Sequence, residues 1–297
     1  MITAWIILFV IFAAFLFVPI SISLLFLQRR KKSRRSPLTS QLLRGPGESL
    51  RHQLEKTSDK LDDFFFIMVI VAVIALGLLA ALASTSNGKI FMWQLWSLAI
   101  CYILMMTLLS LRFYRLFRHR QDLYLGLDGE LAVGQELNLL MLDGYRVFHD
   151  FPADSFNIDH IVIGPNGVFA VETKGRPKPV KGDVNIIYDG EGLKFPTHYE
   201  SEPLEQAKRQ ATWLAKWLTN AVGSQVAVKP VLAFPGWYIV RKKPGMLIYN
   251  GKSPQALFKV QGEIPLNSEM IQRISYQVEQ RCRDVEPVAY RKEKKSN

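Results

Sequence analysis

Residues 156–175 read FNIDHIVIGPNGVFAVETKG, and this stretch decides how the C-terminal part of the chain folds. Two apolar runs flank a Gly-Pro-Asn-Gly turn, which predicts a β-hairpin. Three charged residues interrupt the apolar runs, namely Asp159, Glu172 and Lys174. A charge inside a strand is unfavourable unless another group pairs it or the protein uses it. These three residues are therefore candidates for a functional site.

The register of the hairpin decides whether the two carboxylates meet. Side chains alternate between the two faces of a strand, so Glu172 and Lys174 share one face. A loop with an even number of residues would place Asp159 directly opposite Glu172, with Cβ atoms about 4.5–5.5 Å apart. A three-residue loop with a glycine bulge, which Pro-Asn-Gly also favours, would turn Asp159 to the other face. The chemistry favours the even loop, but turn preferences leave both registers open.

Two opposed carboxylates repel each other unless a cation lies between them. A hard divalent metal, Mg²⁺ or Mn²⁺, would satisfy both Asp159 and Glu172, with water and a substrate phosphate completing its shell. Such a metal lowers the pKa of a bound water, and Lys174 could hold that water or stabilise the developing negative charge. The pattern therefore indicates hydrolysis of phosphodiester bonds. The alternative is a salt-bridge patch of the same residues on an exposed face of the sheet.

The residues around the hairpin predict one α/β domain over 121–287. The helical spacing of leucines after residue 126 predicts a helix that ends at Asp143-Gly144, and two later helices are predicted over 201–222 and 268–285. Further strands are predicted at YRVFHDF (145–151), VNIIYD (184–189), VAVKPVLAF (226–234), WYIV (237–240) and MLIYN (246–250). The order of helix, three strands, helix, strand and helix suits a mixed central sheet flanked by helices.

Three motifs in this domain resemble the nuclease-related domain (NERD), a branch of the PD-(D/E)XK, restriction-endonuclease-like nucleases. They are GLDGE at 126–130, FNIDHIVIGPNGVFAVETK at 156–174 and EPLEQ at 202–206. The similarity covers roughly residues 121–285. It implies the restriction-endonuclease-like fold, a Mg²⁺ or Mn²⁺ cofactor, and a nucleic-acid substrate, with DNA favoured over RNA.

The resemblance also implies a role for individual residues. Asp159 and Glu172 would hold the metal, and Lys174 would be the catalytic lysine. Glu130 resembles an extra acidic residue that reaches the metal, although without the family it reads as a solvent-facing helix residue. Gln206 resembles a glutamine that lies near the phosphate in some members, although a polar residue in the first turn of a helix needs no such role.

Other polar residues of the domain invite a functional interpretation. Strand alternation turns His160 away from Asp159, which predicts a packed, hydrogen-bonded histidine instead of a general base. Basic residues that could contact phosphates, or could be solvated loop charges, follow two of the strands: Arg176, Lys178, Lys181, Arg241, Lys242 and Lys243. The two cysteines of the chain, Cys101 and Cys282, cannot form a disulfide framework or a Cys-rich zinc site.

Three uncharged apolar segments precede the domain, at about 3–27, 64–84 and 91–111. Each is long enough to cross a bilayer, so residues 1–120 are predicted to be a membrane region with three transmembrane helices. The first segment lacks a basic flank before it and is too long for a signal peptide. Basic residues in the 29–63 loop and at 112–120 place these segments inside. The N-terminus is then expected outside and the α/β domain in the cytoplasm.

The net charge of +11 belongs mainly to the membrane region. Residues 1–120 hold 15 Lys and Arg against five Asp and Glu, whereas the rest of the chain holds 22 against 21. The basic run at 29–35 suits anionic lipids, so the charge is no evidence for a nucleic-acid partner. Residues 49–61 are either an amphipathic helix on the membrane surface or a solvated connector. Residues 288–297 are predicted to be a disordered basic tail.

The leading hypothesis is a membrane-anchored, metal-dependent nuclease. The alternative is a catalytically silent nucleic-acid-binding or scaffolding module that is tethered to the membrane. A transporter is disfavoured, because Gln94 is the one obvious polar side chain in the apolar segments and a transport pathway needs more.

Overall fold

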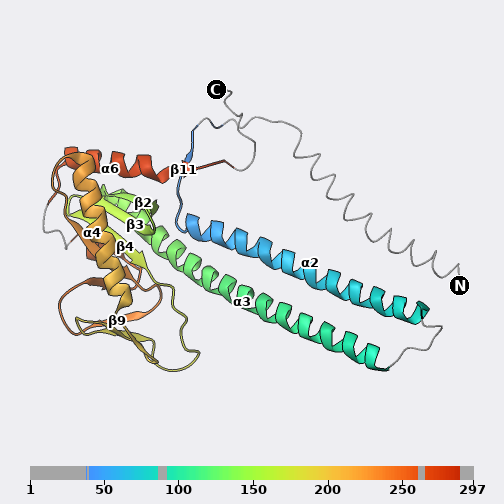
Figure 1. Ribbon diagram of the computed structural model, residues 1–297. Coiled ribbons are helices and arrows are strands. Elements are labelled where there is room, and N and C mark those ends of the chain that lie inside the picture. The colour runs from blue at the N-terminus through green and yellow to red at the C-terminus, as the bar shows by residue number, and fades with distance from the viewer. Residues whose placement is uncertain (1–37, 39, 86–91, 260–264, 288–297) are drawn as a thin grey trace. The chain divides into compact units, whose positions relative to one another are not determined.

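The computed structural model describes residues 38, 40–85, 92–259 and 265–287 (Figure 1). Residues 43–283 form one compact unit, and a second unit comprises residues 1–42 and 284–297. The predicted span at 3–27, the basic run at 29–35 and the predicted tail at 288–297 lie outside the described residues.

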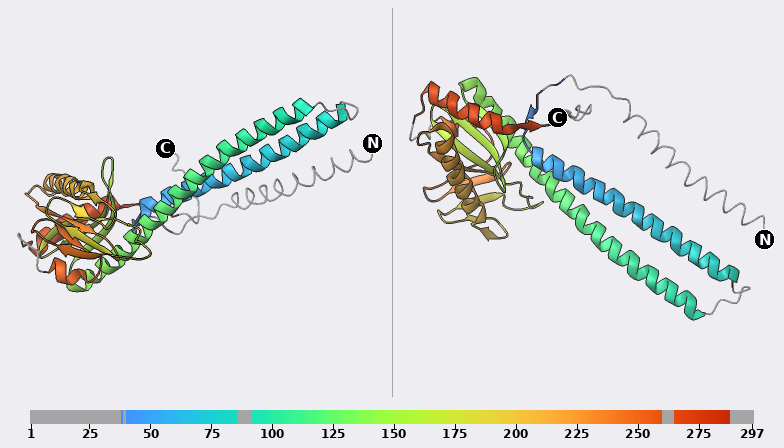
Figure 2. Two further views of the ribbon diagram at one scale, coloured as in Figure 1. Left: turned by 90° about the horizontal axis from the view of Figure 1, so that it is seen from below. Right: turned by 45° about the horizontal axis from the view of Figure 1, so that its top comes forward.

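Two long helices, α2 (Glu48–Thr85) and α3 (Met92–Asn138), lie side by side in all views (Figures 1 and 2). Both are long and apolar enough to cross a membrane, and none of the most apolar stretch of either helix is buried. Large apolar side chains such as Phe66, Leu76 and Trp93 are exposed on them. The segment predicted at 64–84 and the described part of the segment predicted at 91–111, from residue 92 on, are therefore helical, with the exposed apolar surface that a membrane helix requires.

Residues 49–61 are part of α2, so the predicted amphipathic helix is confirmed and the solvated connector is wrong. Its apolar side, however, packs inside the protein and not on a membrane surface. Leu54 and Leu61 are buried, and Leu54 packs with Leu123 and Leu127 of α3. The apolar stripe faces a second helix instead of lipid or water. The sequence did not predict this partner, because α3 is one continuous helix that begins in the apolar segment, includes the GLDGE motif and ends at Asn138.

The central sheet is mixed, as predicted. It has the strand order β10-β8-β4-β3-β2. Strands β2 (Arg146–Pro152), β3 (Asn157–Gly164) and β4 (Gly167–Thr173) pair antiparallel, whereas β8 (Val228–Ala233) lies parallel to β4 and to β10 (Leu247–Tyr249). The antiparallel hairpin thus joins a parallel pair at β4, and the end of β4 lies inside the sheet.

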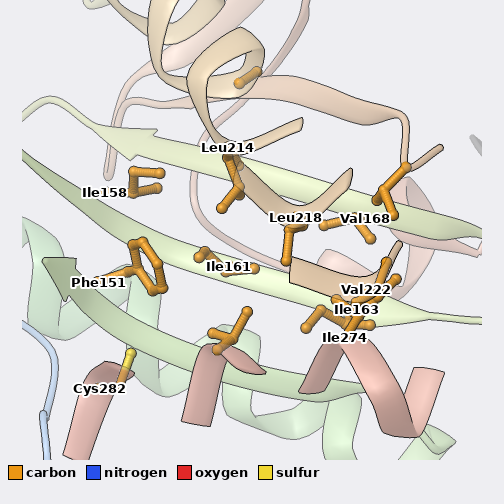
Figure 3. Packing of buried hydrophobic residues seen from close by; sticks show 14 residues of the cluster. Phe151, Ile158, Ile161, Ile163, Val168, Leu214, Leu218, Val222, Ile274 and Cys282 are labelled. Atoms are coloured by element: carbon orange, nitrogen blue, oxygen red, sulfur yellow. The ribbon is translucent and has the colours of Figure 1, made fainter. Parts of the chain in front are cut away.

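Both faces of this sheet are covered, which explains its nearly continuous apolar strands. Helices α4 (Glu202–Val222) and α6 (Ser268–Cys282) cover one face, where Leu214, Leu218 and Ile274 pack over Ile161 and Ile163 (Figure 3). The C-terminal part of α3, the 3₁₀ helix η1 (Leu139–Asp143) and α5 (Pro254–Phe258) contribute to the core on the other face. The sheet is therefore a buried support for residues at the strand ends.

A second sheet, which the sequence did not predict, has the strand order β7-β6-β5-β9. Its strands are β5 (Asn185–Tyr188), β6 (Leu193–Lys194), β7 (Tyr199–Glu200) and β9 (Tyr238–Arg241). β6 and β7 have two residues each, too few to show an alternating pattern. The sheet packs on the central one, because Ile186, Leu193 and Phe195 form a core with Leu232 and Phe234.

Two short strands, β1 (Leu42–Leu43) and β11 (Arg283–Val285), pair with each other. The helix predicted over 268–285 therefore ends at Cys282, three residues early. The backbone of Arg283 has left the helical region, with φ of −95° and ψ of 70°, and the β-branched Val285 suits a strand better than a final helical turn.

Candidate active site

The hairpin has the even loop. Gly164 pairs with Gly167 and His160 with Val171, so only Pro165 and Asn166 form the loop. The Asn166 side chain donates hydrogen bonds to the backbone carbonyls of Phe258, at 3.1 Å, and Lys259. These bonds fix the turn, and the register brings the start of β3 beside the end of β4, as the even loop requires.

Asp159 lies just beyond the last regular pair of the hairpin. Its Oδ2 accepts a hydrogen bond of 2.6 Å from the backbone N–H of Thr173. Burial raises the pKa of Asp159 well above its usual value, and the carboxylates of Glu172 and Glu130 raise it further. Asp159 is therefore held in place by β4 within the field of two other acidic groups.

Glu172 is the centre of a three-membered hydrogen-bond network. Its Oε1 accepts bonds of 2.7 Å from Lys174 Nζ and from Gln206 Nε2, and Lys174 Nζ also donates to Gln206 Oε1 at 2.7 Å. Glu172 is 3% exposed, so this is not a salt-bridge patch on an exposed face. Its other oxygen, Oε2, is buried and has no hydrogen-bond partner among the described residues. β4 supplies Glu172, Lys174 directly follows the strand, and α4 supplies Gln206.

Glu130 on α3 is buried, which contradicts its interpretation as a solvent-facing helix residue. It is 8% exposed, and its Oε2 makes no hydrogen bond within the described part of the chain. Burial raises the pKa of Glu130 to about 8, with further contributions from Asp150 and Glu172, while a bond from the backbone of Gly47 opposes the shift. The structure therefore brings Glu130 into the same electrostatic environment as Asp159 and Glu172.

Asp150 is a fourth acidic residue of this environment, and sequence reasoning missed it. The pairs His149–His160 and Phe151–Ile158 flank it, so it lies across from Asp159 in the β2–β3 register. Its backbone is left-handed, with φ of 49°. The available signal was a charge inside the apolar strand YRVFHDF, the same signal that singled out Asp159.

A short segment before and at the start of α2, which we call the strap (residues 44–49), holds Asp150. Arg44 Nη1 donates to Asp150 Oδ2 at 2.6 Å, and Ser49 donates to the same oxygen from its backbone N–H at 3.0 Å and its hydroxyl at 2.7 Å. Burial raises the pKa of Asp150, whereas Ser49 and Arg44 oppose that shift. Because the backbone of Gly47 also bonds to Glu130, the strap contacts two of the four acidic residues. We call these four, Glu130, Asp150, Asp159 and Glu172, the acidic cluster.

His160 is a packed, hydrogen-bonded histidine, as predicted. Its Nδ1 lies 2.9 Å from Nδ1 of His149, whose Nε2 lies 3.0 Å from Asn138 Oδ1. Burial lowers the pKa of His149 to about 4, and burial together with His149 lowers the pKa of His160 well below its usual value. Both rings are therefore neutral at physiological pH.

The basic candidates lie at the surface in different states. Arg176 forms an ion pair with Glu200 at 3.1 Å, and Arg241 donates to the carbonyl of Ile248. Lys178 is exposed, and so are Lys181, Lys242 and Lys243. The charge of Arg176 is therefore partly neutralised, whereas Lys178 makes no ion pair with the described residues.

The sequence that contains these residues matches a known protein family. The family model described as "Nuclease-related domain" matches residues 125–235. Residues 125–235 form a nuclease-related domain. The matched range runs from α3 through the hairpin to the end of β8, so it includes Glu130, Asp150, Asp159, Glu172 and Gln206. The match is consistent with the restriction-endonuclease-like superfamily. The searches of curated proteins and of solved structures found no match.

The nuclease-related domain has the donor chemistry of a divalent-cation site. Within the described residues, no group of three or more His, Cys, Asp or Glu side chains already has the spacing of a metal site. However, Glu130 Oε2 and Glu172 Oε2 are buried carboxylate oxygens that lack a hydrogen-bond partner there, and Asp159 shares their field. Hard oxygen donors of this kind are the ligands that Mg²⁺ and Mn²⁺ prefer.

Proposed function

We propose that the nuclease-related domain hydrolyses phosphodiester bonds of nucleic acid, with DNA favoured over RNA, in a reaction that depends on Mg²⁺ or Mn²⁺. One observation carries the proposal. Lys174 and Gln206 both bind one oxygen of Glu172 at 2.7 Å, while its second oxygen stays unpartnered within the described residues. Buried polar atoms nearly always have a hydrogen-bond partner, so a buried carboxylate oxygen without one calls for an explanation, and a bound metal ion would supply it.

The side chains would divide the work as follows. Asp159 and Glu172 would hold the divalent ion, with Glu130 as a third carboxylate. When bound, the ion supplies positive charge next to the phosphate and lowers the pKa of a coordinated water. Lys174, which Glu172 and Gln206 hold in place, would orient the attacking water and stabilise negative charge on the phosphate.

The test uses the full-length protein in detergent, because Arg44 and Ser49 bind Asp150 and a fragment that begins at 121 would lack them. The protein is incubated with single-stranded, duplex and supercoiled DNA and with RNA, in Mg²⁺, Mn²⁺ or EDTA. Metal-dependent cleavage that Asp159→Asn and Lys174→Ala abolish is the expected result. Lys208→Ala is the matched control, because Lys208 is an exposed lysine of α4 whose ion pair with Glu205 is also exposed.

One observation favours a second candidate, a catalytically silent nucleic-acid-binding or scaffolding module. Among the described residues no metal site is already assembled, and Lys174 lies on the carboxylate that would bind the ion. Binding of nucleic acid without cleavage in any metal, equal in wild type and Lys174→Ala, would support this module and contradict the nuclease.

We further propose that residues 1–120 anchor the domain in a membrane through three spans, with the N-terminus outside and the domain in the cytoplasm. The exposed apolar surfaces of α2 and α3 support two of the spans. The third span and the contact of residues 29–35 with anionic lipids rest on the sequence pattern. An N-terminal epitope tag should react with antibody on intact cells, and a C-terminal tag only after permeabilisation; the reverse pattern would contradict this topology.

A further inference from the structure

A pocket lies immediately beyond the end of β4, where the chain leaves the candidate active site. Its volume is about 230 Å³. Arg176, two residues after Lys174, begins its wall, which continues over Lys178, Phe195, His198 and Trp237. The indole N–H of Trp237 donates to the carbonyl of Arg176 at 3.2 Å, which ties this wall to the loop after β8. The pocket therefore adjoins the segment that follows β4 and Lys174.

The lining of this pocket has the chemistry of a base-binding site. His198 lies flat on Phe195, with ring centroids 4.6 Å apart and an interplanar angle of 3°. Trp237 packs edge-on against Phe195 and, like it, is buried, whereas His198 is exposed. The rings thus form a rigid aromatic platform with the imidazole outermost, and planar side chains of this kind stack on unpaired bases.

The charges at the rim match a nucleic-acid strand. Lys178 is exposed and makes no ion pair among the described residues, and a Cβ atom placed on Gly236 would lie 3.4 Å from its Nζ. Its ammonium group is therefore close to the Gly236-Trp237 turn, beside the pocket. Arg176 lies at the same rim, but its guanidinium group forms an ion pair with Glu200. One ammonium group beside an aromatic platform suits a phosphate with its base.

The size of the pocket limits what it can hold. Pockets that enclose a whole drug-sized ligand have about 300–1,000 Å³. A cavity of about 230 Å³ is smaller, so it suits one flat ring system whose attached chain leaves through the opening. A base pair in a duplex presents its edge and not its face, so only an unpaired base can enter.

We propose that this pocket binds an unpaired base of a single-stranded nucleic acid, next to the phosphate that faces Lys174. The proposal rests on the proposed nuclease function and specifies its substrate class. His198 supplies the stacking surface, and Lys178 contacts a neighbouring phosphate. Single strands, or duplexes with frayed or flipped ends, are then the substrates that the domain prefers.

Binding is measured by fluorescence anisotropy on the full-length protein in detergent with EDTA, so that no cleavage occurs. The probes are a labelled 15-residue oligothymidylate and a blunt hairpin duplex of equal charge. We expect the single strand to bind more tightly. His198→Ala should weaken its binding about 5- to 150-fold, because stacking contributes about 1–3 kcal/mol per base. The affinity for the duplex should not change, and His198→Tyr should restore most of the loss.

Two further variants test the assignment. Lys178→Ala should weaken both probes and reduce the salt dependence of binding by about one phosphate contact. Tyr276→Ala removes an exposed aromatic side chain of α6 and should have no effect. Equal binding of single strand and duplex, or an unchanged affinity in His198→Ala, would overturn the proposal. Competition by thymidine monophosphate at the affinity of the oligomer would also overturn it, because the site would then take free nucleotides.

The same preparation separates this proposal from the nuclease function. Cleavage in Mn²⁺ is measured in parallel on the same single strand. If the protein cleaves the strand but His198→Ala binds it as tightly as wild type does, the base pocket is overturned and the nuclease function is not. Binding that depends on His198, without cleavage in any metal, would support the pocket and contradict the nuclease.

Discussion

Arg44 and Asp150 are 106 residues apart in the sequence, and their side chains form a hydrogen-bonded ion pair of 2.6 Å. Asp150 shares the field of Glu130, and Arg44 belongs to the strap that leads into α2. The pair thus connects the long apolar helix α2 to the acidic cluster of the nuclease-related domain. Because the strap also supplies Gly47 to Glu130, this segment is part of the site and not a passive linker.

Removing Arg44 should destabilise the domain. Arg44→Ala leaves the Asp150 carboxylate buried without its cation, which typically costs about 3–5 kcal/mol for a fully buried pair. Because Arg44 is partly exposed, we expect roughly 2 kcal/mol, measured as a lower thermal unfolding midpoint of the full-length protein by tryptophan fluorescence. Arg51→Ala is the control, since its ion pair with Glu48 is exposed and contributes little. Equal midpoints for the two variants would show that the pair is not structural.

Gln206 should matter for cleavage through Lys174. Gln206→Ala removes the acceptor that holds the lysine and one donor to Glu172, so the lysine can leave the phosphate. Loss of one preorganised donor typically lowers kcat about 100- to 1,000-fold. We expect a smaller loss of about 10- to 100-fold in kcat/KM, because Glu172 still binds Lys174. Lys208→Ala on the same helix should retain wild-type activity. A comparable loss of kcat/KM in Lys208→Ala would show that the effect of Gln206→Ala does not depend on its bond to Lys174.

The hairpin shows what local pattern can predict. The strands, their mixed sheet and the helices on its faces follow from apolar periodicity, because each element buries an apolar face. A shared function of the two opposed charges favours the even loop, and the pairs His160–Val171 and Gly164–Gly167 confirm this register. The placement of Gln206 beside Lys174 could be expected only from the family resemblance.

Other parts of the site depend on contacts that are distant in sequence. Asp150 carries the same signal as Asp159, yet its significance arises from Arg44 and Ser49, which no local pattern links to it. Glu130 looked solvent-facing because a helix pattern shows a polar face but not what covers it. Here the strap covers it. The second sheet was missed because β6 and β7 are set by pairing, not by their own sequence.

Glu130 should make the stability of the metal-free protein depend on pH. Its pKa is raised from 4.5 to about 8, so folding favours the protonated form. This contribution is fully present below pH 4.5 and is lost as the pH rises through about 8. Glu130→Gln should therefore raise the unfolding midpoint relative to wild type at pH 9 but not at pH 4.5. Asp128→Asn, an exposed neighbour on α3, is the control and should show no such difference.

Mn²⁺ provides a second readout of the same residue. An ion that binds only the folded protein stabilises it by about 2.7 kcal/mol at a concentration of 100 times Kd. At pH 9 the unfolding midpoint of wild type should rise with Mn²⁺, and the rise should be smaller in Glu130→Gln and absent in Asp159→Asn. A rise of equal size in all three proteins would show that the ion binds elsewhere.

The paired histidines should make the domain sensitive to acid. Burial lowers the pKa of His149 to about 4, below the value of 6.5 for an unfolded chain, so folding favours the neutral ring. Stability is then lost as the pH falls from 6.5 towards 4, by about 2 kcal/mol at pH 5 for this one group.

His149→Gln keeps a side chain that can bond to Asn138 or His160 but cannot titrate. Between pH 7 and pH 5 its unfolding midpoint should fall less than that of wild type. His52→Gln replaces an exposed histidine of α2 and should retain the wild-type pH dependence. If His149→Gln retained it as well, the acid sensitivity would have to arise from other groups.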